Sequence, residues 1–338
     1  MVKELAIHQR KLGDAVGVTS LLPEQDDFAA LRAELERHQV ACLFPERTPG
    51  NFGKLWHLYH AIRRFKPDVL IAHATVPAFY ARALPTSAPI IFVMHSSVND
   101  FERLLFRGVE WLLSRRAGAV IGVSEANVKD YVASVRTHRL MQIIPNGVDT
   151  ARFVCTTGVE NLARPPQIVQ IGRYNSIKNQ LQTVRAFAEV VKTNVDARLL
   201  LIGVVEDTVY LAQVQNLVRA LKLEDRVTVD GPRSDISRLL TDSSVFAMPS
   251  RSEAKSIAFL EALATGIPVV ASTIEAFAFA RDYPGVQLVD TTDVSAYSRA
   301  LLGALRQPRV ERPLKGLTLR DTAEQYLAIA HRVAGAVR

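Results

Sequence analysis

The sequence predicts an α/β protein built from two doubly wound domains, each with a parallel sheet covered by helices. Short apolar runs alternate with amphipathic segments along the whole chain, which is typical of parallel α/β units. The alternation stops at residues 162–167 (LARPPQ) and then starts again, and a length of 338 residues fits two domains. We therefore expect one domain at 1–148 and a second at 149–315. A C-terminal helix within 316–338 is expected to return to the first domain.

The same runs give the expected elements in order. The first half contains an amphipathic helix at 27–38 (DFAALRAELERH), and its apolar runs have the length of strands. The expected strands of this half are 15–21, 68–74, 90–95, 119–124 and 141–146. In the second half they are 167–172, 197–203, 226–231, 245–250, 268–272 and 286–290. Helical patterns lie between them at 176–192, 209–222, 235–242, 256–266 and 294–305.

The chain begins directly with a helical pattern, VKELAIHQRKLG. A doubly wound domain normally opens with a strand and a glycine-rich turn, and that first strand is usually central. We therefore expect the N-terminal domain to lack its first strand, so that strands at 16–21 and 69–72 border an unfilled position. Either further residues precede Met1 or the product is a truncated, inactive one. The intact motifs described below favour the first alternative.

Composition narrows the class of protein. The net charge of +7 is spread along the chain, which argues against a nucleic-acid-binding protein but suits anionic small molecules or an anionic membrane surface. Cys42 and Cys155 are too few for a disulfide framework or a cysteine-based metal site. The apolar stretches are too short to span a bilayer, and the first residues lack the apolar core of a signal peptide. We expect a cytoplasmic location, with peripheral binding at the inner face of the membrane as an open alternative.

Two cations lie between the strand at 167–172 and the helix that follows it. They are Arg173 and Lys178, five residues apart. A turn at a helix N-terminus offers free backbone N–H groups and the positive end of the helix dipole, so it attracts anions. These observations favour a metal-free grip on a pyrophosphate. The alternative is a pair of ordinary surface cations on a loop.

Two carboxylates follow the strand at 245–250. Glu253 lies in the loop, and Glu261 lies in a helix that is apolar nearly all round. An unpaired buried charge is very costly, so Glu261 needs partners. Sugar hydroxyls would serve, and the alternative is a structural ion pair with an arginine.

These motifs resemble glycosyltransferase family 4. The match rests on Glu253-x7-Glu261 together with IGRYNSIKN, ATGIPVVAS, IIPNGVDTARF, FVMHSS around His95 and AVIGVSEANVKDYV, in the family's order over almost the whole chain. Members are retaining, nucleotide-sugar-dependent enzymes of the GT-B fold, in which two Rossmann-like domains face a cleft. The resemblance implies an acceptor-binding N-terminal domain and a donor-binding second domain.

The resemblance also implies roles for single residues. Arg173 and Lys178 match the pair that holds the donor diphosphate, and Glu261 matches the residue on the ribose hydroxyls. Glu253 matches the residue near the donor sugar, and His95 the histidine beside the reaction centre; we take these two as the catalytic candidates. The sequence shows no Asp-x-Asp motif at a strand end, so no metal or other cofactor is expected. We expect front-face attack, with the departing phosphate taking the acceptor proton.

The chain departs from the family pattern after Glu253. The run is Ala254–Lys255–Ser256, where members usually carry a glycine or serine and then Phe-Gly. Lys255 adds a positive charge there, which puts the donor sugar in question. Neither the donor base nor the acceptor follows from the sequence.

The acceptor and its location leave several alternatives open. The segment 100–118 combines leucines and Trp111 with arginines, so it either rests on an anionic membrane or packs in the core with a solvated basic face. Family members often use glycan or lipid-linked acceptors in polysaccharide, lipopolysaccharide or glycolipid synthesis, and we expect transfer of a hexose-type sugar to such an acceptor. A nucleotide-sugar 2-epimerase of the same fold and an inactive nucleotide-sugar-binding truncation are the alternatives.

Overall fold

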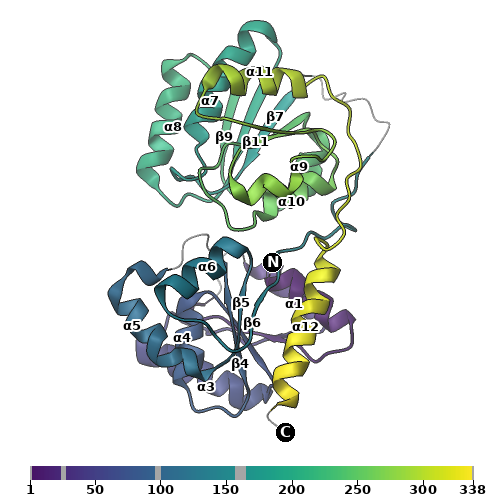
Figure 1. Cartoon of the computed structure of the whole chain (residues 1–338). Coiled ribbons are helices and arrows are strands. Elements are labelled where there is room, and N and C mark those ends of the chain that lie inside the picture. Colours follow the sequence, from purple (N-terminus) through teal and green to yellow (C-terminus); the bar gives the residue numbers. More distant parts are fainter. Residues whose placement is uncertain (1, 24–27, 96–99, 157–164, 337–338) are drawn as a thin grey trace. The chain divides into compact units, whose positions relative to one another are not determined.

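The chain forms two compact α/β units in a computed structural model (Figure 1). Unit 1 holds residues 1–147 and 316–338, and unit 2 holds residues 148–315. Each unit carries a parallel sheet, which confirms the predicted fold class. The structure describes residues 2–23, 28–95, 100–156 and 165–336.

The sheet of unit 1 runs in the order β3–β4–β5–β6, with all strands parallel. Its strands are β3 (Leu70–His73), β4 (Ile90–Met94), β5 (Ala117–Gly122) and β6 (Met141–Ile143). The helices between and before them are α3 (Asn51–Phe65), α4 (Thr75–Ala83), α5 (Leu104–Leu113) and α6 (Glu125–Ser134), with short 3-10 turns at Asp100–Glu102 and Ser114–Arg116.

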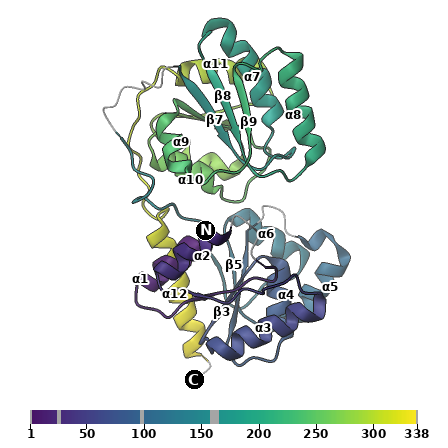
Figure 2. The ribbon, with the colours of Figure 1, turned by 180° about the vertical axis from the view of Figure 1, so that it is seen from behind.

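The central strand β4 is buried on both faces, as a strand of a doubly wound sheet should be. Phe92 and Met94 pack into the core formed with α3, α4 and α6. Ile91 and Val93 point to the other face, where they meet α1 (Val2–Lys11) and α12 (Leu319–Gly335). Helices α1 and α12 come from opposite ends of the chain and lie side by side (Figure 2).

A second, separate pair of strands completes unit 1. The strands β1 (Gly17–Val18) and β2 (Ala41–Cys42) are parallel and are linked by α2 (Phe28–Arg37). None of the described strands joins β1 to β3, so the sheet of unit 1 is split between them. The split lies at the position where the sequence leads us to expect an unfilled strand.

The sheet of unit 2 runs in the order β12–β11–β10–β7–β8–β9. Its strands are β7 (Gln167–Ile171), β8 (Arg198–Ile202), β9 (Val227–Asp230), β10 (Val245–Met248), β11 (Val269–Ser272) and β12 (Val286–Val289). Its helices are α7 (Gln180–Thr193), α8 (Thr208–Ala220), α9 (Ile236–Asp242), α10 (Ile257–Ala264) and α11 (Val294–Ala304), with a 3-10 segment at Glu275–Ala280.

The strand order of unit 2 reverses direction next to its first strand. From β7 the chain proceeds to β8 and β9 on one side, and then crosses back to β10, β11 and β12 on the other. The adjacent strands β7 and β10 therefore flank a topological switch point. In open α/β sheets, ligands bind outside the carboxyl ends of the strands at such a point.

Candidate functional site

The loops that follow β7 and β10 meet at the switch point of unit 2. The two strands are parallel neighbours, with Ile168 opposite Val245 and Val169 opposite Phe246. Their carboxyl ends consequently lie at the same edge of the sheet. The loop at 172–179 carries Arg173 and Lys178, and the loop at 249–256 carries Glu253.

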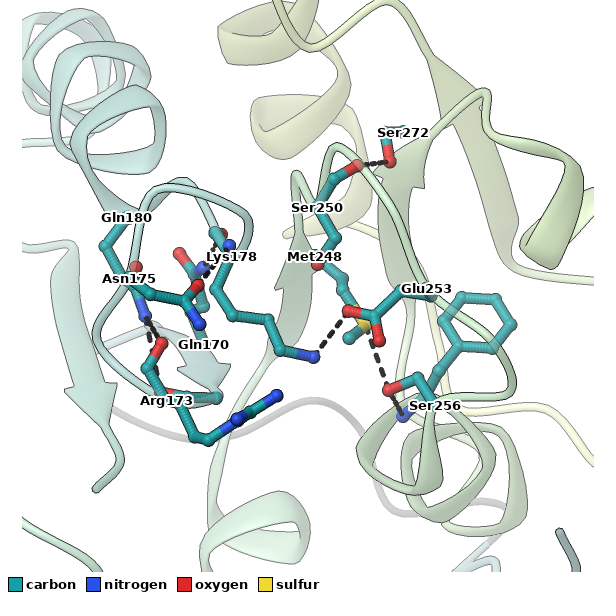
Figure 3. Close-up of polar contacts among 12 residues, drawn as sticks. Gln170, Arg173, Asn175, Lys178, Gln180, Met248, Ser250, Glu253, Ser256 and Ser272 are labelled. Carbon is teal, nitrogen blue, oxygen red and sulfur yellow. Dashed lines mark hydrogen bonds and ion pairs between the residues drawn. The ribbon is translucent and has the colours of Figure 1, made fainter. Parts of the chain in front are cut away.

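Lys178 and Glu253 are in direct contact (Figure 3). The Nζ atom of Lys178 lies 2.5 Å from Oε1 of Glu253, and the two side chains are only 14% and 10% exposed. A pair of opposite charges this far out of water holds its geometry, because separating the partners would leave each charge poorly solvated. The structure thus brings together two residues for which the sequence predicts adjoining roles, on the diphosphate and on the donor sugar.

Side-chain amides fix the loop at 172–179 between strand and helix (Figure 3). Gln170 donates from Nε2 to the carbonyl of Lys178 at 2.7 Å, and Gln180 donates to the carbonyl of Arg173 at 2.9 Å. The Oδ1 atom of Asn175 accepts from the backbone N–H of Lys178 at 2.9 Å. Helix α7 then begins after Asn179, which takes a left-handed conformation with φ of 57°. These contacts hold both cations in the turn, ahead of the first residue of α7.

Arg173, the second cation of this loop, also meets a carboxylate, that of Glu206. Its Nη1 atom lies 2.8 Å from Oε1 of Glu206, and the second Glu206 oxygen accepts from Nδ2 of Asn175 at 2.5 Å. Glu206 comes from the loop after β8, which approaches closely because Gly203 has no side chain. A Cβ at Gly203 would lie 1.9 Å from the carbonyl oxygen of Gly172. Glu206 was missed because no spacing motif links it to the loop after β7.

Glu261 lies on α10 and is half-buried. Ser256 caps the start of this helix, because its Oγ accepts from the backbone N–H of Phe259 at 3.4 Å. Phe259 and Leu260 are buried in the core of unit 2. The predicted apolar helix is therefore present, and it exposes part of the Glu261 side chain, which a polar ligand could reach.

Lys255 lies between Glu253 and the start of α10. Its Nζ atom lies over the ring of Phe279, 3.4 Å from the ring centroid. Burial lowers the pKa of Lys255 to about 8. An anionic group close to this ammonium would favour its charged form. Lys255, at which the chain departs from the family pattern, is therefore a side chain whose charge depends on the groups around it.

His95 belongs to unit 1 and is paired with a second histidine. His95 follows β4 and His73 ends the neighbouring β3, so parallel pairing places both at the same edge of the sheet. The Nδ1 atom of His73 lies 2.8 Å from Nε2 of His95, and the two rings stack. The rings of Tyr326 and His73 also stack, with 6.1 Å between their centroids. Sequence reasoning missed His73, although its position at the end of β3, as His95 follows β4, was a signal.

Both histidines of this pair are held in the neutral form. Burial lowers the pKa of His95 to about 4 and that of His73 to about 3. Of the two facing nitrogens, one therefore carries the hydrogen and the other accepts it. The contact fixes the ring orientation of His95, which leaves its other nitrogen as the one available for a substrate.

Among the described residues, no group of three or more His, Cys, Asp or Glu side chains comes together in a way that could hold a metal ion. None of the described helices is long and apolar enough to cross a membrane.

Two family profiles match the chain. Residues 1–152 match "Glycosyltransferase Family 4", and residues 165–307 match "Glycosyl transferases group 1". Among curated relatives, N-acetyl-alpha-D-glucosaminyl L-malate synthase of Bacillus anthracis is 33% identical over 226 residues. That match covers 61% of this chain and 57% of the relative, little more than half of its length. The UDP-Gal:alpha-D-GlcNAc-diphosphoundecaprenol alpha-1,3-galactosyltransferase of Escherichia coli is 23% identical over 269 residues, which cover 72% of this chain and 68% of the relative.

A solved structure shares the arrangement of elements. Anabaena Alr3699/HepE in complex with UDP-glucose matches with a TM-score of 0.75 and 17% identity, over 99% of this chain and 95% of that one. At this identity the likeness shows the fold alone, which is that of two Rossmann-like domains of the GT-B type. The family profiles, which match both units, show that the chain belongs to the family 4 type of glycosyltransferases.

Proposed function

We propose that the protein is a retaining glycosyltransferase that moves a hexose-type sugar from a nucleotide-diphosphate sugar to a glycan or lipid-linked acceptor in cell-surface glycan or glycolipid synthesis. The observation that carries the proposal is the Lys178–Glu253 pair at the switch point of unit 2, with Arg173 on the same loop. The names of the similar proteins support it, since they mention UDP-glucose, UDP-galactose and a diphosphoundecaprenol-linked acceptor.

The proposed reaction breaks the bond between the anomeric carbon and the diphosphate. The electron pair of that bond leaves with the diphosphate, whose developing charge Arg173 and Lys178 stabilise. The acceptor hydroxyl attacks on the same face of the sugar, and its proton passes to the departing phosphate oxygen. Glu253 binds the sugar hydroxyls, Glu261 binds the ribose, and His95 contacts the reacting sugar.

The ion pair gives Lys178 a second task in this scheme. An ammonium group has three N–H donors, so Lys178 can keep its contact with Glu253 and also donate to a phosphate oxygen. The pair thereby sets the position of the diphosphate relative to the sugar-binding carboxylate. Arg173 is more exposed, and the Glu206 carboxylate beside it offsets part of the charge that Arg173 offers to the phosphate.

An assay with a panel of UDP- and GDP-sugars and a lipid-linked acceptor tests the proposal. The expected product keeps the anomeric configuration of the donor, which NMR of the new glycosidic bond reports. We expect EDTA to leave the activity unchanged, because arginine and lysine serve where other glycosyltransferases use a metal. An inverted product or a strict Mg²⁺ requirement would contradict this scheme. A changed sugar nucleotide without any acceptor would instead identify a 2-epimerase.

We also propose that unit 1 binds an anionic membrane surface through α5. The helix is anchored on its inner side, where Glu110 makes a bidentate contact with Arg82 at 2.8 and 2.6 Å and accepts from Tyr131. Its outer side is apolar and open to solvent, so the alternative of a core-packed helix is wrong for these residues. The exposed side chains are Leu104 (72%), Leu105 (74%), Trp111 (56%) and Leu112 (69%).

Basic residues accompany this apolar surface. Arg103 and Arg107 lie beside the exposed leucines, and Arg115 follows the helix. Apolar side chains inserted among lipid head groups, with arginines near anionic lipids, are the arrangement of an interfacial helix. In a sedimentation assay, the protein should pellet together with phosphatidylglycerol vesicles, and the variant Leu112→Asp should remain in the supernatant. The control Val209→Asp, at a side chain that is 66% exposed in unit 2, should not. Equal retention of both variants would contradict the proposal.

A further inference from the structure

We propose that Asn179 is a positioning residue for glycosyl transfer, which sets where Lys178 lies relative to Glu253 by joining the loop at 172–179 to the loop at 249–256. The inference deepens the proposed function and rests on it, because it concerns how the diphosphate-binding lysine is placed beside the sugar-binding carboxylate. Asn179 is only 5% exposed, and it lies at the junction between the first loop and α7.

Two hydrogen bonds join the two loops near the ion pair. The Nδ2 atom of Asn179 donates to the carbonyl of Pro249 at 3.3 Å. The backbone N–H of Arg251 donates to the carbonyl of Ile177 at 2.8 Å. We call these two bonds the loop clasp. Lys178 lies between Ile177 and Asn179 in the sequence, so the residue on each side of it is bonded to the opposite loop.

The loop clasp acts on the backbone, where the ion pair cannot. Figure 3 shows the side chain of Lys178 reaching Glu253 from the opposite loop. A lysine carries its ammonium group on a long flexible stem, so this contact alone leaves the position of the lysine backbone open. Glu253 follows only two residues after Arg251, which belongs to the clasp. The clasp therefore places both charges before a donor binds, which is what electrostatic stabilisation of a leaving group requires.

The choice of asparagine fits both tasks of this position. The backbone of Asn179 is left-handed, with φ of 57° and ψ of 41°. Glycine adopts this conformation most easily, and asparagine is among the few other residues that visit it. Glycine, however, offers no side-chain donor for Pro249. Asparagine is also a favoured helix cap, yet the side chain of Asn179 forms no cap with the described residues of α7. Its amide is used between the loops instead.

The variant Asn179→Gly tests the inference, because it keeps the left-handed backbone and removes one donor of the clasp. We expect kcat to fall about tenfold, since a small misplacement of the lysine lowers the rate strongly. The Kd of free UDP, measured by calorimetry on the full chain, should stay nearly unchanged, because Lys178 and Arg173 are still present. The matched control is Lys222→Gly, at an exposed residue after α8 whose φ is 55°. It should change neither quantity.

Double variants separate a positioning role from a general structural one. In a Lys178→Met background, Asn179→Gly should lower kcat no further, because the cation that it positions is absent. In an Arg173→Gln background the loss of about tenfold should persist, because Arg173 precedes the clasped part of the loop. Equal losses of kcat in the two backgrounds would overturn the inference. An unchanged kcat in Asn179→Gly alone would overturn it as well.

Amide hydrogen exchange gives a readout that does not depend on catalysis. In peptides that contain Arg251, exchange should become faster in Asn179→Gly and stay unchanged in Lys222→Gly, because the loops separate more often without the clasp. Unchanged exchange in Asn179→Gly would overturn the inference even if glycosyl transfer is observed. Faster exchange in a protein that transfers no sugar from any nucleotide donor would support the clasp and refute the proposed function.

Discussion

Lys178 and Glu253 are 75 residues apart in the sequence, yet Nζ of one lies 2.5 Å from a carboxylate oxygen of the other. The contact joins the loops after β7 and β10 at the point where the strand order of unit 2 reverses. It links the residue expected on the donor diphosphate to the residue expected on the donor sugar. The consequences for stability and for turnover can be separated by substitution.

The first prediction concerns this pair. Lys178→Met leaves Glu253 with 10% exposure and no counter-charge at Nζ, so we expect a loss of about 2 kcal/mol of unfolding free energy, measured in urea. The double variant Lys178→Met/Glu253→Gln should recover most of that loss, because neither charge remains. Turnover should fall about 10²–10³-fold in both variants, since the cation at the diphosphate is gone in each. Recovery of turnover in the double variant would show that the pair is only structural.

The second prediction concerns Glu206. This carboxylate competes with a diphosphate for Arg173, and the exposed pair itself contributes only about 0–1 kcal/mol. Glu206→Gln should therefore raise the affinity for UDP or GDP several-fold while leaving stability nearly unchanged. Glu224→Gln, which removes an exposed carboxylate before β9, is the control for net charge. A lower nucleotide affinity in Glu206→Gln would mean that Glu206 orients Arg173 for binding.

The third prediction separates the two carboxylates of the family motif. Glu261→Ala should weaken the binding of free nucleoside diphosphate, because its expected partner is the ribose in ground and transition states alike. Glu253→Ala should mainly lower turnover, because its expected partner is the reacting sugar. Calorimetry with the free nucleoside diphosphate and steady-state kinetics measure the two effects. Losses of nucleotide affinity that are equal in both variants would contradict this division of roles.

The fourth prediction concerns pH and the His73–His95 pair. Burial holds the pKa values at about 3 and about 4, whereas an unfolded chain protonates histidine near 6.5. The unfolded state then binds more protons between about pH 4 and 6.5, so unfolding free energy should be highest above pH 6.5 and fall as the pH drops through this window. Each such histidine contributes about 1.4 kcal/mol per pH unit there.

Urea unfolding at pH 7 and pH 5 checks the histidine prediction. His73→Asn should reduce the difference between the two pH values, and His331→Gln, at an exposed histidine of α12, should leave it unchanged. A pH dependence that His73→Asn does not alter would show that other groups cause it. The same variant also frees the ring of His95, so a changed pH profile of turnover is expected as well.

The sequence by itself determined the elements that depend on local pattern. The strand at 167–172 and the helix after it follow from apolar periodicity, and the structure places them at β7 and α7. The apolar helix around Glu261 and the position of His95 at a strand end are local in the same sense. The gap expected between the strands near 16–21 and 69–72 also appears, as the split between β1 and β3.

Only the tertiary structure decided which side chains meet. The pairing of Lys178 with Glu253, of Arg173 with Glu206 and of His95 with His73 depends on which strand ends are neighbours, and apolar periodicity does not encode strand order. Exposure was decided in the same way, because the sequence leaves open whether the leucines of α5 are buried, and the structure shows Glu110 holding the opposite face of that helix inward. Contacts between distant segments arise from sheet order and helix packing, and these depend on the whole chain rather than on any local segment.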